Sequence, residues 1–354
     1  MSTPIVLAVD GNSLLHRAFH ATARTMYRTP DGAQGWAVRG LLSQLVAAVD
    51  RVCADAVVVG FDDRGNSSRK RRWPTYKAQR APKPESLERQ LDLAVEVLRE
   101  LGVTVVVPEG LEADDVLASV AAQAPAMGAR TVVATSDRDS FALIDEHTRM
   151  LRILNGGVDA SPLLDPARLA MVTGVRPEQY LDLAALRGDS SDNLPGVTGF
   201  GAKTAVKLLQ ALDTAEAAFD DAANGGERCT AAIGKARAKA LAAPEAKERW
   251  LFNREVMAMV TTAELGLDLT SGGGGLPLDE DAVRATYSRF ELHVPSAIRA
   301  LTLREPTRTV TEPRHETPWQ DPRWKAAAPR ERIGPLPKLI PAPSGPAYVQ
   351  EALF

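Results

Sequence analysis

Acidic residues follow the short apolar runs of this 354-residue sequence wherever such a run ends. The runs at 5–9, 56–61, 103–107 and 131–135 predict strands that are buried on both faces. In an open α/β sheet, the active-site crevice lies outside the carboxyl ends of the strands. We therefore expect nine acids to meet at one edge of the sheet: Asp10, Asp62, Glu112, Asp114, Asp115, Asp137 and Asp139, with Asp189 and Asp192 from the segment GDSSDN.

Such a cluster needs positive charge, because neighbouring carboxylates raise one another's pKa. Oxygen ligands without histidine or cysteine suit Mg²⁺ or Mn²⁺ rather than zinc. Two such ions roughly 4 Å apart can hold a phosphodiester for in-line attack by water. The nine acids therefore predict a two-metal phosphodiesterase site. A single acid at a strand end can also be a helix cap or a solvated loop residue, which is how we interpret Asp63.

The segment GVTGFGAKTA predicts a helix-hairpin-helix over about residues 193–209. Its glycines permit a tight turn, and backbone amides at the start of the second helix can bind phosphate oxygens. Such a hairpin holds duplex DNA by its backbone without reading the bases. The expected contacts are Gly196, Gly199, Gly201, Lys203, Thr204 and Lys207. An ordinary αα-hairpin is the alternative. The basic residues Arg228, Lys235, Arg237 and Lys239 either extend this phosphate track or form a solvated helix face.

Residues 64–89 contain nine Lys or Arg and two Glu, interleaved with Trp73 and Tyr76. Basic and aromatic side chains together suit a passage for single-stranded nucleic acid, in which phosphates are neutralised and bases stack. The stretch begins directly after Asp62, so we expect it to start beside the metal site and to form a basic arch that includes Arg69. A solvated basic loop is the alternative.

Helical patterns at 38–52, 87–101 and 113–123 alternate with the strands, which predicts a doubly wound, mainly parallel α/β core over residues 1–176. From about residue 177 to 304 the pattern is helical, which predicts an α-helical second domain. Residues 305–354 hold 10 of the 24 prolines, so we expect a disordered tail.

Composition excludes several classes of protein. The chain is 45% hydrophobic and 25% charged, an ordinary globular balance. It has no apolar stretch of membrane length and no signal-peptide pattern, and its two cysteines lack metal or disulfide spacing. We expect a cytoplasmic monomer with no membrane association. The net charge of −3 does not by itself indicate nucleic-acid binding.

Seven segments from about residue 4 to about residue 304 resemble the bacterial 5′→3′ exonucleases of the flap-endonuclease superfamily. They are VDGNSLLHRAFH, FDD, YKAQRAP, EGLEADDVLAS, TSDRDSFALI, LRGDSSDNLPGVTGFGAKTA and the helices that follow. The resemblance implies a PIN-like 5′-nuclease core with a helical arch. Ser68 departs from the phenylalanine usual in the family, and Trp36 and Arg39 also differ from its common pattern.

The resemblance also implies roles for individual residues. Asp10, Asp62, Glu112 and Asp114 would serve one metal, and Asp115, Asp137, Asp139 and Asp192 the other, with Asp189 alongside. Lys77 and Arg80 would contact the scissile phosphate, and Tyr76 would stack on a nucleobase. Backbone carbonyls of Val197 and Phe200 would hold a monovalent cation, K⁺.

The function expected from these observations is a Mg²⁺-dependent, structure-specific 5′→3′ exonuclease and 5′-flap endonuclease. Its substrates would be DNA with 5′ flaps, nicks or 5′ ends, and RNA primers. The alternatives are a non-catalytic DNA-junction-binding protein of the same fold and a PIN-type ribonuclease. The last residues, QEALF, resemble the peptide Gln-x-x-Leu-Phe that binds bacterial sliding clamps, through Gln350, Leu353 and Phe354.

Overall fold

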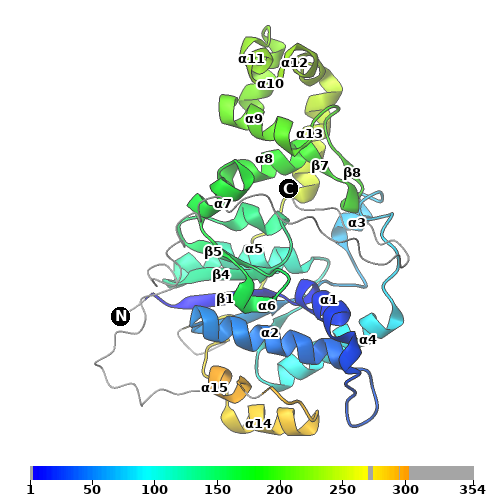
Figure 1. Ribbon diagram of the computed structural model, residues 1–354, viewed down its shortest axis with the longest axis vertical. Coiled ribbons are helices and arrows are strands. Elements are labelled where there is room, and N and C mark those ends of the chain that lie inside the picture. Colours follow the sequence, from blue (N-terminus) through cyan, green and yellow to red (C-terminus); the bar gives the residue numbers. More distant parts are fainter. Residues whose placement is uncertain (1–2, 270–273, 295, 303–354) are drawn as a thin grey trace, which may run out of the picture.

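The four predicted strands are four adjacent strands of a six-stranded sheet in the computed structural model, which describes residues 3–269, 274–294 and 296–302 (Figure 1). The strand order is β3-β2-β1-β4-β5-β6, and only β6 runs antiparallel to its neighbour. The bounds are β1 Ile5–Asp10, β2 Ala56–Gly60, β3 Thr104–Val106, β4 Arg130–Thr135, β5 Thr148–Arg152 and β6 Leu163–Leu164. The expected doubly wound, mainly parallel sheet is confirmed.

The strand order changes direction at β1, which pairs with β2 on one side and with β4 on the other. The sheet therefore has its switch point between β1 and β4, where a crevice opens at the carboxyl ends. β5 was not predicted from the sequence, because Arg149 and Arg152 interrupt its apolar run.

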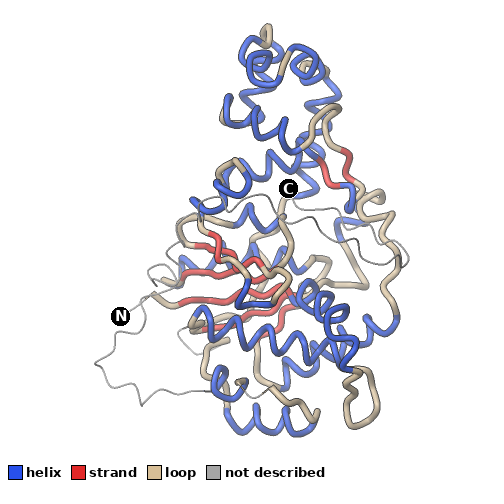
Figure 2. The backbone as a smooth tube through the Cα atoms, in the orientation of Figure 1, coloured by secondary structure: helices blue, strands red, loops and turns tan. Residues whose placement is uncertain are grey.

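Alternate residues of the strands face opposite helical layers, as the two-residue period of a strand requires. Ile5, Leu7 and Val9 pack on one face against α1, α2 and α4, which span Gly11–Thr22, Trp36–Val52 and Glu85–Glu100. Val6 and Ala8 pack on the other face against α5, Ala113–Gln123. Figure 2 shows the strands enclosed between these helices. β1 and β2 are thus buried on both faces, which explains their continuous apolar sequences.

Short elements complete this part of the chain and connect it to the helical part. They are α3 Ser68–Arg72, α6 Gly157–Ala160 and α7 Pro166–Thr173. Of the arch predicted over 64–89, only α3 and the start of α4 are helical.

The helical part holds α8 to α13 around an apolar cluster in which Trp250 is fully buried and to which Met150 and Leu164 of the sheet also belong. Its helices are α8 Pro177–Arg187, α9 Ala202–Leu212, α10 Ala215–Ala223, α11 Glu227–Ile233, α12 Lys235–Leu241 and α13 Pro244–Met257. A small hairpin, β7 Gly188–Asp189 with β8 Leu194–Pro195, connects α8 to the turn before α9.

The last two described helices lie away from the helical part, at the opposite end of the molecule (Figure 1). They are α14 Glu280–Arg289 and α15 Ala297–Thr302. Val283 and Leu301 are fully buried in the same apolar cluster as α2 and α4. The structure therefore attaches α14 and α15 to the α/β core, whereas the sequence analysis grouped them with the second domain. Among the described residues, no helix has the length and apolar character needed to cross a bilayer.

Candidate active site

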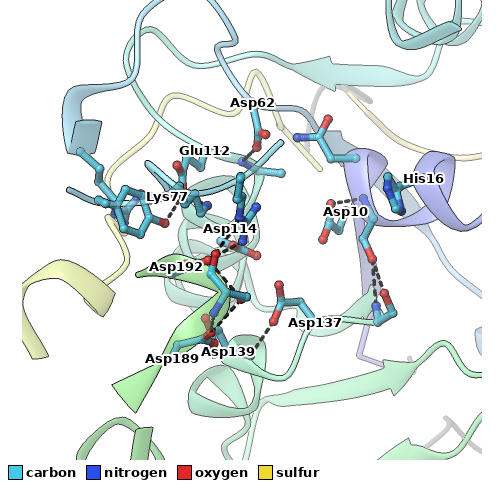
Figure 3. Close-up of a pocket in the computed structure, with 18 of the residues that line it drawn as sticks. Asp10, His16, Asp62, Lys77, Glu112, Asp114, Asp137, Asp139, Asp189 and Asp192 are labelled. Carbon is cyan, nitrogen blue, oxygen red and sulfur yellow. Dashed lines mark hydrogen bonds and ion pairs between the residues drawn. The ribbon is translucent and has the colours of Figure 1, made fainter. Parts of the chain in front are cut away.

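Eight of the nine predicted acids line one cavity of about 330 Å³ at the carboxyl edge of the sheet. They are Asp10, Asp62, Glu112, Asp114, Asp137, Asp139, Asp189 and Asp192. Figure 3 shows their carboxylates around a common space, with Asp10 and His16 on one side and Asp189 and Asp192 on the other. The convergence expected from the strand ends is thus present in the fold for these eight.

Asp10 is the last residue of β1 and the N-cap of α1. One of its carboxylate oxygens accepts a hydrogen bond from the Ser13 amide at 2.8 Å, and the other accepts from the Thr135 hydroxyl at 2.8 Å. The first turn of α1 and the end of β4 therefore fix this side chain from both sides.

The N-terminus of α5 brings two more acids to the cavity. Asp62, after β2, accepts a hydrogen bond from the Ala113 amide at 3.0 Å, which ties the end of β2 to the start of α5. Asp114 follows Ala113 on α5, and its buried Oδ1 has no hydrogen-bond partner. Glu112, the N-cap of α5, accepts hydrogen bonds from the Tyr76 hydroxyl and from Lys77 Nζ, each at 3.0 Å.

The remaining acids come from the loop after β4 and from the β7–β8 hairpin. Asp137 Oδ1 accepts a hydrogen bond from the Asp139 amide at 3.0 Å, and Asp189 Oδ1 accepts from the Ser191 amide at 2.8 Å. Asp192 is buried and pairs with Arg80. The hairpin thus carries acids from the helical part of the chain to the sheet edge.

Burial and mutual repulsion raise the pKa of three of these carboxyl groups. Burial, and then Asp62 and Asp137, raise the pKa of Asp10 to about 7, against the opposing effect of its hydrogen bonds. Burial and the neighbours Asp137, Asp189 and Asp192 raise the pKa of Asp139 to about 7. Burial, Asp137 and Asp10 raise the pKa of Asp114 well above its usual range. A cluster with these properties favours a bound cation.

The donor set fits hard divalent cations. All eight groups offer carboxylate oxygens, and the Asp114 oxygen without a partner is buried beside the cavity. Within the described part of the chain, no three acidic, histidine or cysteine side chains form a ready-made ion site in this conformation. Glu112 and Asp192 are engaged by arch cations instead, so ion binding requires these side chains to exchange partners.

Asp115 is the ninth predicted acid, and it does not line the cavity. It is fully buried on another side of α5, and both of its oxygens pair with Arg69, at 2.6 and 2.7 Å. Arg69 itself is buried, so it does not present its guanidinium to solvent. The structure thus gives these two residues a placement different from the predicted metal-ligand and DNA-contact roles.

Three cations of the arch face the acids. Lys77 contacts Glu112, Arg80 contacts Asp192, and Lys83 Nζ lies 4.0 Å from Asp62 Oδ2. The Lys77 amide also donates to the Asp192 carbonyl at 2.9 Å, so the arch is pinned to the β7–β8 hairpin. A phosphate entering the cavity would meet positive charge along one wall.

Tyr76 does not present its ring as the predicted stacking surface. It is 6% exposed and packs against Leu194 and Val256, while its hydroxyl donates to Glu112. Burial and nearby Glu112 raise its pKa above the usual range. In this conformation Tyr76 anchors the arch to the hairpin, and it orients Glu112.

The predicted helix-hairpin-helix is built from α8, the β7–β8 hairpin, the glycine-rich turn and α9. Gly199 has a φ of +81°, and both Gly199 and Gly201 are exposed with open space where a Cβ would stand. Lys203 and Lys207 are exposed on α9, and Thr204 is partly exposed. The first amides of α9 have no partner within the helix and point out of its N-terminus. This surface suits a phosphate.

Gly196, Val197 and Phe200 lie inside the turn rather than on its surface. A Cβ at Gly196 would stand 2.1 Å from the Arg187 carbonyl oxygen, so this glycine permits two backbone segments to approach closely. Val197 and Phe200 are buried, and the Val197 carbonyl accepts a hydrogen bond from the Phe200 amide at 2.9 Å.

Several residues that line the cavity were not predicted from the sequence: Asn12, Ser13, His16, Arg17, Lys83, Ser136 and Ser191. Four of them lie on α1, at the spacing that places residues on one helix face. Burial, and then His20, Lys83 and Arg80, lower the pKa of His16. The signal available in the sequence was the helix start at Asp10, whose first two turns must lie beside that acid. Gln350, Leu353 and Phe354 lie outside the described residues.

The acid-lined cavity lies at the switch point of a parallel sheet. A basic arch faces it and a glycine-rich helical hairpin flanks it. This combination defines a nuclease, an enzyme that cleaves the phosphodiester bonds of nucleic acids. The model of the 5′-3′ exonuclease N-terminal resolvase-like domain matches residues 5–171, and that of the 5′-3′ exonuclease C-terminal SAM fold matches residues 175–274. Together these ranges span most of the chain. The chain belongs to the 5′-3′ exonuclease family, whose members act on DNA.

Relatives and solved structures agree with this assignment. The chain is 38% identical over 206 residues to DNA polymerase I of Mycobacterium tuberculosis, covering 58% of this chain and 23% of that protein. It is 32% identical over 315 residues to DNA polymerase I of Chloroflexus aurantiacus, covering 86% and 32%. It thus spans about a quarter to a third of these relatives. The fold is similar to that of the bacteriophage T5 D15 flap endonuclease, crystallised as a pseudo-enzyme-product complex with DNA and metal ions (18% identity, TM-score 0.55, 81% of this chain and 99% of that one).

Proposed function

We propose that this protein hydrolyses phosphodiesters in DNA, and in RNA primers, as a 5′→3′ exonuclease and 5′-flap endonuclease that requires two Mg²⁺ or Mn²⁺ ions. One observation carries the proposal: eight carboxylates from five chain segments meet at one cavity, opposite three cations of the arch. Structural packing alone does not require so many like charges in one place.

Asp137 is central to the cluster, because it raises the pKa of Asp10, of Asp114 and of Asp139. We assign Asp10, Asp62, Glu112 and Asp114 to one ion, and Asp137, Asp139, Asp189 and Asp192 to the second. When bound, the ions would supply a nucleophile at neutral pH and stabilise the attacking and departing oxygens. The T5 flap endonuclease of similar fold holds DNA and metal ions in its crystal, which supports the use of metal ions.

The chain's own residues hold and polarise the substrate. Lys77 and Arg80 neutralise the charge that develops on the scissile phosphate, once the phosphate displaces Glu112 and Asp192 from them. The exposed turn of Gly199 and Gly201, with Lys203, Thr204 and Lys207, binds the duplex backbone. Carbonyl oxygens of Val197 and Phe200 hold a K⁺ ion in the same turn. DNA with a 5′ flap suits this pairing, because the hairpin takes the duplex and the arch takes the single strand.

Cleavage of end-labelled substrates tests the proposal. The purified chain is incubated with 5′-flap, nicked, blunt duplex and RNA-primed DNA, with Mg²⁺ or with EDTA. Flap and nicked substrates should be cut only with Mg²⁺, and Asp137→Asn should abolish cleavage while it leaves flap affinity within about threefold. Asp159→Asn is the matched control, because Asp159 is exposed on α6 and does not line the cavity. Metal-independent cleavage, or normal turnover by Asp137→Asn, would contradict the two-metal assignment. Tight flap binding without any cleavage would indicate a junction-binding protein.

A further inference from the structure

A buried arginine lies where the arch leaves the α/β core. Arg69, on α3, is 8% exposed, whereas the other lysines and arginines of residues 64–89 are exposed or partly exposed. A buried guanidinium needs partners for its donors, because an unpaired buried charge is strongly disfavoured. The question is which groups it meets.

Arg69 meets two carboxylates and two carbonyls, and the weaker ion pair is with Glu112, whose Oε2 lies 3.6 Å from Nη1. Its Nη1 and Nη2 donate to the two oxygens of Asp115 at 2.6 and 2.7 Å, a bidentate pair. Nη2 also donates to the Ala258 carbonyl at 2.8 Å, and Nε donates to the Val256 carbonyl at 3.3 Å. These carbonyls lie at and just beyond the end of α13. Arg69 thus joins the arch, α5 and the segment that leaves the helical part.

Both carboxylate oxygens of Asp115 are also fully hydrogen-bonded. Besides Arg69, its Oδ2 accepts a hydrogen bond from the Glu112 amide at 2.9 Å, and its Oδ1 accepts from the Val260 amide at 2.8 Å. One turn later on α5, Ser119 Oγ accepts from the Ala263 amide at 3.0 Å, which ties the same segment a second time. With two donors on each oxygen and no exposed surface, Asp115 has no free ligand position for an ion.

Arg69 lies at the edge of the cavity, and the residues beside this pair face it. Glu112, whose amide Asp115 holds, accepts from Tyr76 and Lys77 of the arch. Asp114 precedes Asp115 on α5, and Met257 and Met259, adjacent to the carbonyls that Arg69 holds, line the cavity. A shift of the pair would therefore move the arch, the start of α5 and the chain after α13 together.

We propose that Arg69 and Asp115 are positioning residues: they bind neither metal ion nor DNA, and they lock the arch and the end of α13 onto α5 so that Glu112 and Lys77 stand at the cavity. This inference rests on the proposed function only in that the cavity is taken as the active site. It replaces the metal role of Asp115 and the DNA role of Arg69 with one shared structural role.

The test compares Arg69→Lys, Asp115→Asn and the double variant with the unmodified chain. We expect each single variant to lower the single-turnover rate at least tenfold at saturating enzyme and Mg²⁺. The double variant should be no slower than the slower single variant, because both changes break one contact. Binding of Mn²⁺ by calorimetry and of flap DNA should stay within about threefold. Trypsin should cut the arch at least tenfold faster in every variant.

Several results would overturn the proposal. A tenfold weaker Mn²⁺ affinity in Asp115→Asn alone would make Asp115 a metal ligand. A tenfold weaker DNA affinity in Arg69→Lys, with normal trypsin resistance, would make Arg69 a DNA contact. Additive rate losses in the double variant, or no change in rate in any variant, would show that Arg69 and Asp115 are not coupled.

Hydrogen exchange on the unmodified chain keeps the proposal testable if a variant does not fold. The Val260 amide should remain protected when Mg²⁺ is added, because Asp115 keeps its partners. Loss of that protection on adding Mg²⁺ would show that Asp115 turns toward an ion, and it would overturn the proposal. Metal binding, proteolysis and exchange are measured without turnover, so absence of nuclease activity would contradict the proposed function and leave these readouts intact.

Discussion

Gly196 and Gly201 stand five residues apart in the glycine-rich turn, yet the structure predicts opposite consequences for replacing them with alanine. A Cβ at Gly196 would lie 2.1 Å from the Arg187 carbonyl oxygen, 2.4 Å from the Arg187 carbonyl carbon and 2.8 Å from the Leu186 carbonyl oxygen. All three are backbone atoms that cannot rotate away. A Cβ at Gly201 would meet nothing within 4 Å.

The magnitudes follow from these surroundings. Inserting a methyl group into a packed site costs about 1–3 kcal/mol, and a backbone clash belongs at or above the top of that range. We therefore expect Gly196→Ala to lower the free energy of unfolding by ~3 kcal/mol or more. Gly201 is the N-cap of α9 with a φ of −107°, so Gly201→Ala should cost ~1 kcal/mol or less. Its added methyl should instead weaken flap-DNA binding, because it occupies the surface that a phosphate would approach.

Urea denaturation followed by circular dichroism, together with flap-DNA titrations, separates the two effects. Gly196→Ala should also lower the cleavage rate, because the β7–β8 hairpin beside it carries Asp189 and Asp192. Equal stability of the two variants, or a loss below 1 kcal/mol in Gly196→Ala, would refute the claim that this glycine serves close packing.

Three further predictions follow from the site and the tail. Burial and acidic neighbours raise the pKa of Asp10 to about 7 from its ordinary value of 3.8, so its ionisation opposes folding increasingly as the pH rises from about 4 through 7. In EDTA, Asp10→Asn should therefore stabilise the protein against urea by up to ~4 kcal/mol at pH 8 and hardly at all near pH 3.5; the same change at both pH values would argue against this cause. Lys77→Ala should lower the single-turnover rate on flap DNA more than it weakens binding, and a loss of affinity alone, at unchanged rate, would make Lys77 a tether. Deleting residues 350–354 should abolish binding of a purified sliding clamp in a calorimetric titration while leaving cleavage without clamp unchanged; equal binding by both chains would exclude the peptide.

Residue types and strand ends were sufficient to predict the acidic cavity, because parallel strands deliver their carboxyl ends to one edge whatever the details of packing. The positions of Asp10 and Asp137 at this edge could be predicted without further information. Asp115 could not be assigned in this way. Consecutive helical residues point about 100° apart, so Asp114 and Asp115 cannot both face the cavity, and the partner of Asp115 is 46 residues away.

Other placements depended on packing that a single sequence does not encode locally. Tyr76 has the composition of an exposed stacking residue, and its burial arises from Leu194 and Val256, which are more than a hundred residues distant in the chain. The apolar faces of α14 and α15 were visible as helical periodicity, but nothing in their sequence specified that α2 and α4 would cover them.

The return of the chain to α14 and α15 has a consequence for how the molecule is made. The α/β core is discontinuous in sequence: its first portion ends before α8, and its last portion follows the whole helical part. During synthesis the surface of α2 and α4 stays uncovered until residues near 302 have left the ribosome, by which time the helical part can already have folded as a unit. A recombinant fragment that stops at residue 176 would expose the apolar positions that Val283 and Leu301 otherwise cover, and we expect it to aggregate. The catalytic core is thus closed by the segment that is translated last among the described residues.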